Sequence, residues 1–223
     1  MDETKKAAAL RALELVRPGM AVGLGTGSTS EIFIELLGKR NRLKDMGLTC
    51  IATSNASEKQ AKRLGLRLFG FDKIRRLDIA FDGADQVDPS LCLIKGLGGA
   101  LVREKIVDYR AERFVIMVGE NKIVGELSGI VPVEVIPLAE EAVKRDLAKL
   151  GAKRLETRMD GKRKFISDNS NIIIHAEFPG IKDPKRLEER INGIPGVVDN
   201  GVFSQKKPVV IIGQKDGSAR LFR

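Results

Sequence analysis

The sequence is poor in the residues that most often act as metal ligands, nucleophiles and base-stacking platforms. It has one histidine, two cysteines, one tyrosine and no tryptophan among 223 residues. His175 lies in a strand-like apolar run, and Cys50 and Cys92 also lie in apolar runs, so we expect three packed side chains. The common zinc ligand sets are missing, so we expect no zinc site. Any proton transfer then falls to carboxylates or lysines.

Long apolar runs are also missing. The chain is 43% hydrophobic, which is ample for a core, but no segment has the length needed to span a membrane. The first six residues are mostly polar or charged and lack the apolar region of a secretory signal. Together with two packed thiols, this predicts a cytoplasmic protein with no membrane partner.

The formal charge of +9 raises the possibility of a nucleic-acid partner. Against it, lysine and arginine are dispersed along the chain, and aromatic residues make up only 4% of it, which leaves few platforms for stacking bases. No zinc-finger or helix-turn-helix pattern is present. We therefore expect no nucleic-acid partner and a basic surface that attracts small anionic substrates.

In the first 131 residues, apolar runs of strand length alternate with segments of helical periodicity. The predicted strands are 20–24, 48–52, 77–81, 91–94 and 114–118, and the predicted helices lie over 4–16, 32–37, 58–64 and 100–109. This alternation predicts an α/β fold with a Rossmann-like, mostly parallel sheet and helices on both faces. In such sheets ligands collect at the carboxyl ends of the strands.

The pattern changes from about Pro132. Predicted strands and helices follow in the order strand 133–136, helix 138–150, strands 153–158, 164–167 and 171–178, helix 183–191 and strand 197–203. This order resembles the ferredoxin-like split βαβ arrangement of a smaller α+β domain. Two last strands, 208–213 and 219–222, are expected to return to the first domain. We therefore predict one domain of residues 1–131 and 206–223, and a small domain of residues 132–205.

A loop rich in glycine and hydroxyl groups, Gly-Thr-Gly-Ser-Thr at 25–29, joins a predicted strand to a predicted helix. The unpaired N–H groups and dipole of a helix N-terminus favour an anion, and Thr26, Ser28 and Thr29 add donors. The alternative is an ordinary turn in which a hydroxyl caps the helix. We favour phosphate binding. The glycine spacing differs from the dinucleotide fingerprint and a Walker A lysine is absent, so we expect a substrate phosphate instead of a nucleotide.

Charged residues follow two apolar runs between Asp82 and Glu104. Asp82 and Asp85 flank a Gly-Ala pair after one predicted strand, and Lys95 follows the next. The two acids could cap a helix, ligate Mg²⁺ or bind substrate hydroxyls, and the pattern does not decide among these. Glu104 alone could be a solvated helix residue paired with its basic neighbours. Charge at the end of a buried strand is costly unless it is paired or used, so the stretch is predicted to be an active site.

Several segments, in order along the chain, resemble ribose-5-phosphate isomerase of the A type. They are the loop 25–29, Asp82-Gly-Ala-Asp85, Lys-Gly-Leu-Gly-Gly-Ala-Leu-Val-Arg-Glu-Lys at 95–105 and Pro-Val-Glu-Val-Ile-Pro at 132–137. Segments 191–197 and 201–203 extend the resemblance into the second domain, so that it covers nearly the whole chain. The sequence departs from the common family pattern at Gln86, Leu97 and Ser170.

The resemblance implies an aldose–ketose isomerase that interconverts D-ribose 5-phosphate and D-ribulose 5-phosphate through an enediolate, in the non-oxidative pentose phosphate pathway. It implies a sugar phosphate as substrate, no metal or organic cofactor, and a homodimer or homotetramer with contacts through the small domain. Glu104 is then the general base, Lys95 stabilises the enediolate, and Asp82 and Asp85 bind the sugar. Further substrate-binding residues that it implies are Thr26, Gly27, Ser28, Thr29, Gly83, Ala84, Gly96, Leu97, Gly98 and Lys122.

Two other functions stay open at this point. One is a sugar-phosphate-sensing module without turnover; a transcription factor of that type would need a DNA-binding segment, for which too few residues precede the first strand. The other is a sugar-phosphate deaminase or acyl-CoA transferase of similar architecture.

Overall fold

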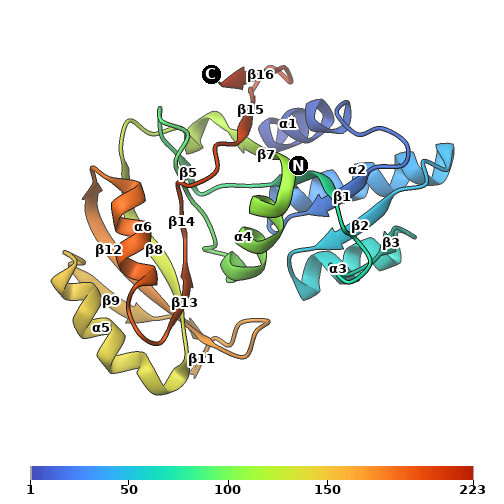
Figure 1. The fold of residues 1–223 in the computed structure, drawn as a ribbon. Coiled ribbons are helices and arrows are strands. Elements are labelled where there is room, and N and C mark those ends of the chain that lie inside the picture. Colours follow the sequence, from blue (N-terminus) through green and yellow to red (C-terminus); the bar gives the residue numbers. More distant parts are fainter. Residues whose placement is uncertain (1, 223) are drawn as a thin grey trace. The chain divides into compact units, whose positions relative to one another are not determined.

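The computed structural model describes residues 2–222, which divide into two compact units. The first unit consists of residues 1–84, 103–122 and 206–223, and the second of residues 85–102 and 123–205. The chain is drawn in Figure 1. Among the described residues, no helix combines the length and the apolar content that crossing a bilayer requires.

The first unit contains a seven-stranded sheet. All neighbouring strands are parallel except β15 and β16, which form an antiparallel pair at one edge. In sheet order its strands are β16 (Ala219–Phe222), β15 (Val209–Gly213), β7 (Ala111–Gly119), β4 (Leu77–Asp82), β1 (Ala21–Leu24), β2 (Thr49–Ala52) and β3 (Arg67–Leu68). Its helices are α1 (Glu3–Leu13), α2 (Ser28–Lys44), α3 (Asn55–Arg63) and the part of α4 (Leu101–Arg110) that follows Val102.

Helices cover both faces of this sheet, as the alternation of side chains along its central strands requires. Val22 and Leu24 of β1 belong to a core shared with α1 and α2, whereas Gly23 faces the opposite side, against Val107 of α4. Figure 1 shows α1 beside β7 and β15. The predicted α/β fold with a large, mostly parallel sheet is therefore confirmed.

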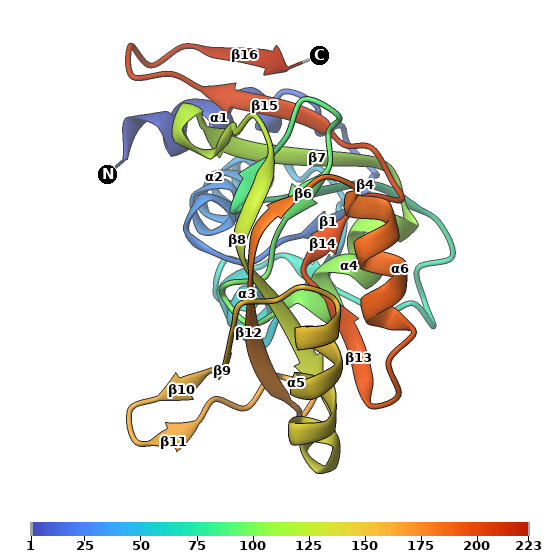
Figure 2. The ribbon, with the colours of Figure 1, turned by 90° about the vertical axis from the view of Figure 1, so that its left-hand side faces the viewer.

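The second unit is built on an antiparallel sheet of four strands, drawn in Figure 2. In sheet order these are β13 (Val197–Asn200), β8 (Leu127–Val135), β12 (Ile172–Ile181) and β9 (Arg154–Thr157). Helices α5 (Glu140–Lys149) and α6 (Pro184–Asn192) contribute Val143, Leu147 and Ile191 to its apolar core. Two small sheets complete the unit: β10 (Met159–Asp160) with β11 (Arg163–Lys164), and β14 (Val202–Phe203) with β6 (Leu93–Ile94) and β5 (Gln86–Val87).

Three predicted strands differ from the structure. Of the run 164–167, only Lys164 lies in a strand, β11, and Ile166 forms an isolated bridge with Ile172. The apolar run 91–94 forms a strand only at Leu93–Ile94, because Leu91 has a left-handed backbone (φ 59°) in a turn closed by Asp88; the strand belongs to a small sheet and not to the large one. The run 197–203 is broken into β13 and β14 at Gly201, where a Cβ would lie 2.4 Å from the Lys95 carbonyl oxygen. Residues 85–102 group with the second unit. Residues 123–131 group with it as well. The division into a domain of residues 1–131 and 206–223 and a small domain of residues 132–205 stays a prediction.

Candidate functional site

The loop 25–29 ends directly at the N-terminus of α2, and its geometry favours an anion. Gly27 is the N-cap residue, has a left-handed φ of 97° and makes no side-chain capping bond. The alternative of a hydroxyl that caps this helix is therefore wrong. The N–H groups of the first turn point out of the helix end together with the positive end of its dipole, which is the arrangement that binds phosphate in many proteins.

The Thr26 hydroxyl is used to hold this loop against the end of β2. Its Oγ1 lies 2.7 Å from Thr53 Oγ1 and 2.8 Å from Ser54 Oγ. Ser54 in turn caps α3 in a reciprocal capping box with Ser57. The ends of β1 and β2 are thus joined by hydroxyl groups, which leaves Ser28 and Thr29 as the hydroxyls at the start of α2.

A lysine that the sequence analysis did not single out contacts the same loop. The Nζ atom of Lys5, on α1, donates to Ser28 Oγ at 2.9 Å and lies 3.7 Å from an Asp2 carboxylate oxygen. The α1 helix approaches β15 closely because residue 213 is glycine: a Cβ there would lie 1.8 Å from the Thr4 carbonyl oxygen. In the sequence, Lys5 resembles any solvated lysine on an amphipathic helix, and no local pattern distinguishes it.

Asp82 connects the end of β4 to the same loop. Its side chain is fully buried, and Oδ1 accepts hydrogen bonds from the Thr26 N–H (3.0 Å), the Ser30 hydroxyl (3.1 Å) and the Gly83 N–H (2.7 Å). Gly25 makes this possible, since a Cβ there would lie 2.1 Å from Asp82 Oδ1. Asp82 Oδ1 therefore orients two backbone segments, the loop that follows β1 and the turn that follows β4.

Glu104, Lys122 and Ala84 are the other predicted residues of the first unit, and Ala84, half-buried, directly follows Gly83. Glu104 lies in the first turn of α4 and is only 3% exposed, so the alternative of a solvated helix residue is wrong. Arg103, its neighbour, donates to Asn55 Oδ1 of α3 at 3.0 Å and so orients the start of this part of α4. Lys122 ends the short 3₁₀ helix η1 (Glu120–Lys122) after β7 and is half-buried.

The remaining predicted residues, Asp85 and the loop Lys95–Gly98, belong to the second unit. Asp85 Oδ2 accepts the Leu97 N–H at 3.1 Å, so the aspartate holds the loop. Lys95 is 2% exposed, its N–H donates to the Gly201 carbonyl oxygen at 2.9 Å, and its ammonium lies 5.2 Å from the centroid of the Phe203 ring. A buried ammonium over an aromatic face keeps part of the stabilisation that it loses on leaving water.

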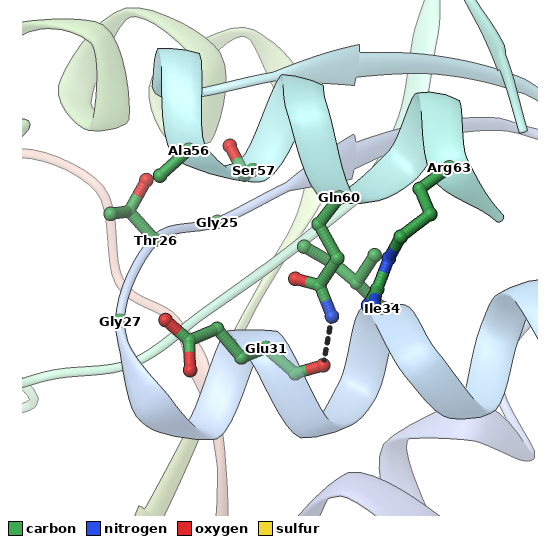
Figure 3. Close-up of a pocket in the computed structure, with 9 residues that line it drawn as sticks. All are labelled: Gly25, Thr26, Gly27, Glu31, Ile34, Ala56, Ser57, Gln60 and Arg63. Carbon is green, nitrogen blue, oxygen red and sulfur yellow. Dashed lines mark hydrogen bonds between the residues drawn. The ribbon is translucent and has the colours of Figure 1, made fainter.

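A cavity of about 250 Å³ adjoins the loop on the side of α3 (Figure 3). Gln60 spans it, donating to the Glu31 carbonyl oxygen at 2.8 Å, and Arg63 lies 3.4 Å from Glu35. The residues that line it are Gly25, Thr26, Gly27, Glu31, Ile34, Ala56, Ser57, Gln60 and Arg63. The Glu31 carboxylate makes this hollow less suited to an anion than the helix end beside it.

The scarce residues behave as packed side chains. Cys50 and Cys92 are buried, and burial raises the pKa of the Cys50 thiol to about 12. His175 is half-buried. Its pKa is lowered mainly by burial and, to a smaller extent, by the nearby Arg158 charge. Within residues 2–222, no three His, Cys, Asp or Glu side chains are grouped so that they could hold a metal ion.

Comparison with known proteins identifies the family. Residues 49–217 match the family described as "Ribose 5-phosphate isomerase A (phosphoriboisomerase A)". The chain belongs to the ribose 5-phosphate isomerase A family. It is 42% identical over 231 residues to ribose-5-phosphate isomerase A of Pyrococcus horikoshii, a match that covers 100% of this chain and 99% of that one. The corresponding protein of Methanosarcina acetivorans is 43% identical over 97% of this chain and 93% of its own.

Solved structures of ribose 5-phosphate isomerases are also similar. The structure from Methanocaldococcus jannaschii has a TM-score of 0.93 and 42% identity, and covers 98% of this chain and 97% of that one. A D-ribose-5-phosphate isomerase in complex with phospho-erythronic acid has a TM-score of 0.93 and 40% identity, with 97% and 96% covered. The predicted family is therefore confirmed, and it is a family of aldose–ketose isomerases.

The three residues at which the sequence departs from the common pattern of this isomerase family all lie in the second unit. The Gln86 side chain donates to the Ser128 carbonyl oxygen at 2.8 Å and accepts the Ser128 N–H at 3.0 Å, which a shorter or charged side chain would not reproduce. Ser170 has a left-handed φ of 65°, the conformation that a glycine adopts without strain. Leu97 is 36% exposed and takes part in the loop through its backbone.

Proposed function

We propose that this protein interconverts D-ribose 5-phosphate and D-ribulose 5-phosphate as an aldose–ketose isomerase. The observation that carries the proposal is the 42% identity to a ribose-5-phosphate isomerase A over essentially the whole of both chains. The loop 25–29, called the anion loop below, suits a substrate that carries a phosphate. Asp82 and Glu104, the buried acids of the proposed site in the first unit, suit a reaction that transfers a proton.

In this proposal the phosphate binds at the start of α2. The N–H groups of Gly27, Ser28 and Thr29 and the two hydroxyls are the donors, and the Lys5 ammonium supplies charge beside Ser28. Lys122 is a second cation for the anionic substrate. Binding energy from the phosphate, which does not react, then serves to place C1 and C2 of the sugar.

Glu104 is the proposed general base. From the aldose it takes the proton on C2, which leaves an enediolate, and it then delivers a proton to C1, which gives the ketose. A proton must also move from O2 to O1 for the charges to balance. A base that is only 3% exposed exchanges its proton with solvent slowly, which suits a proton that is taken and returned.

Lys95 is proposed to stabilise the enediolate oxygen, and Asp82 and Asp85 to orient O1 and O2. Positive charge in a water-poor site acts most strongly where negative charge develops in the transition state. Each aspartate already uses one oxygen for the protein itself: Asp82 for the anion loop, and Asp85 for the Leu97 N–H. We therefore propose that both aspartates also keep the substrate-binding backbone in place, including Gly83, Ala84, Gly96 and Gly98.

The test is an assay of ribulose 5-phosphate formation from ribose 5-phosphate in the presence of EDTA. The wild type is expected to turn over, and Glu104→Gln to lose roughly 10²–10⁴-fold in kcat while substrate still binds. Glu112→Gln is the matched control, because Glu112 is exposed and pairs with Arg76. Binding of ribose 5-phosphate without product would favour the sensing module, and product formation at a normal rate by Glu104→Gln would remove Glu104 from the role.

We also propose a homodimer or homotetramer with contacts through the small domain. Ile130, Ile136 and Leu138 of the second unit expose 40%, 49% and 97% of their surface and are apolar side chains that such a contact could cover. Light scattering of the purified protein measures the assembly. A cytoplasmic location stays a prediction based on the composition.

A further inference from the structure

Arg158 lies between β9 and β10, where its guanidinium has two partners at once. Its Nη1 donates to the Leu97 carbonyl oxygen at 3.0 Å. Its Cζ lies 3.8 Å from the centroid of the Phe165 ring, a stacking distance. Neither of these two partners is an acid. The half-buried guanidinium instead donates to a backbone carbonyl oxygen of a glycine-rich loop.

The loop that Arg158 contacts needs restraints from outside. Leu97 lies between Gly96, which has a φ of 88°, and Gly98, and glycines leave the backbone many conformations in the absence of other contacts. Leu97 is held at both of its polar atoms: its N–H by Asp85 Oδ2 at 3.1 Å and its carbonyl oxygen by Arg158. Two residues before it is Lys95, the proposed cation of the site.

The approach of Arg158 to the loop depends on a further glycine. Gly99 has a φ of 96°, and a Cβ on it would lie 2.6 Å from both Arg158 Nη1 and the Phe165 ring. The loop, the guanidinium and the ring therefore pack without a gap between them. A close fit of this kind transmits the position of one group to the next.

Phe165 is itself firmly held, so that it can act as a support. Its ring packs against Leu101, Val102 and Ile173, and its N–H donates to the Arg158 carbonyl oxygen at 2.9 Å. The segment that follows it is held by the buried Glu134, whose Oε1 accepts hydrogen bonds from the side chains of Ser167, Asn169 and Asn171 at 2.9, 3.1 and 2.9 Å.

We propose that Arg158 is a positioning residue for the lysine–glycine loop: by holding the Leu97 carbonyl oxygen against the Phe165 support, it fixes the backbone that carries Lys95. This inference rests on the proposed isomerase function. Because Lys95 is proposed to act on the enediolate and the phosphate binds at residues of the first unit, a loosened loop lowers kcat more than it raises KM.

The kinetic test compares Arg158→Met with Arg154→Met, in which an exposed arginine paired with Glu156 is removed from the same strand region. Arg158→Met is expected to lower kcat by roughly 10–100-fold with KM within about threefold, and Arg154→Met to leave both unchanged. Arg158→Lys, which keeps one donor and the charge, is expected to recover part of kcat. A kcat of Arg158→Met within twofold of the wild type overturns the proposal.

A second measurement does not depend on activity. Amide hydrogen exchange of residues 96–99 in the free protein is expected to be at least about tenfold faster in Arg158→Met than in the wild type and in Arg154→Met. If the wild type does not isomerise ribose 5-phosphate, the proposed function fails, but the exchange still shows whether Arg158 holds the loop. Unchanged exchange overturns the inference. Should Arg158→Met not fold, Phe165→Leu removes the support while keeping an apolar side chain, and the same faster exchange is expected.

Discussion

The hydrogen bonds of Asp82 lead to a test that separates its structural role from any contact with a ligand. Three donors converge on Oδ1: the N–H groups of Thr26 and Gly83 and the hydroxyl of Ser30. Asp78, at the other end of the same strand, provides a matched control. Within residues 2–222, its side chain makes one hydrogen bond, from the Ala21 N–H to Oδ2 at 2.8 Å. The side chain is 29% exposed, and Arg76 lies 3.4 Å away.

Asp82→Ala leaves these donors without their acceptor. A buried donor that loses its partner costs roughly 1–3 kcal/mol, which gives an upper limit of roughly 9 kcal/mol for the set. Thr26 and Gly83 are only part-buried, so water replaces some of the loss. We expect roughly 3–5 kcal/mol, which is near the limit of what single substitutions cost. Asp82→Asn keeps one oxygen acceptor, replaces the other carboxylate oxygen with an NH₂ donor and loses the charge, so we expect roughly 1–2 kcal/mol.

The assay is thermal unfolding followed by circular dichroism. For a chain of this size each kcal/mol shifts the melting temperature by roughly 2–4 °C, so Asp82→Ala is expected to lower it by roughly 6–20 °C. Asp78→Ala, which loses one hydrogen bond and a screened ion pair, is expected to lower it by roughly 2–4 °C and to leave isomerase activity intact. Equal shifts for the two alanine variants would refute the reasoning, because they would mean that the convergent donors add nothing.

Three further predictions follow from single contacts. Lys5→Met is expected to raise the KM for ribose 5-phosphate by roughly tenfold, whereas Lys6→Met, which removes only an exposed pair with Glu3, leaves it unchanged; equal effects would argue against Lys5 as a phosphate ligand. Thr29→Val is expected to raise KM more than it lowers kcat, and an unchanged KM would argue against its phosphate role. The Lys164 ammonium, the Thr157 hydroxyl and Lys144 lower the pKa of Glu140 from 4.5 to about 2. The stability that this carboxylate contributes is therefore present above pH 4.5 and is lost as pH falls from 4.5 towards about 2. Since its partner Lys164 is 51% exposed, we expect this loss in the free energy of unfolding to be only roughly 1–2 kcal/mol, and Glu140→Gln to remove it, as measured by urea unfolding at several pH values. The same pH dependence in Glu140→Gln and the wild type would contradict this.

Much of the candidate site could be predicted because its signals are local. Asp82 directly follows an apolar run, and Gly25 to Thr29 combine a strand end, small residues and hydroxyls within five positions. Each of these patterns can be recognised within a short segment, without knowing which other segments lie next to it in the folded protein. The family resemblance added the role of general base for Glu104, and its burial shows that it is not the ordinary solvated helix residue that its basic neighbours would suggest.

Other parts of the site could not be predicted because their partners are distant in the sequence. Lys5 and Ser28 are 23 positions apart, and Arg158 and Leu97 are 61 positions apart. Neither lysine nor arginine is rare in this chain, so nothing local distinguishes these two from the other cations. The run 91–94 was mistaken for a strand of the large sheet for a related reason: its apolar side chains report burial but not the sheet to which they are joined.

The sequence by itself determined the α/β class, the glycine-rich loop between the first sheet strand and its helix, the acids at the strand end and the family, because periodicity and motifs are properties of neighbouring residues. Only the tertiary structure decided how these groups are held: Gly25 is glycine because Asp82 occupies the space of its Cβ, and the Leu97 carbonyl oxygen is held by an arginine from another strand region. Such restraints arise when folding closes long loops of chain and brings close-packed atoms together, and no residue carries a local signal of the partner that it will meet.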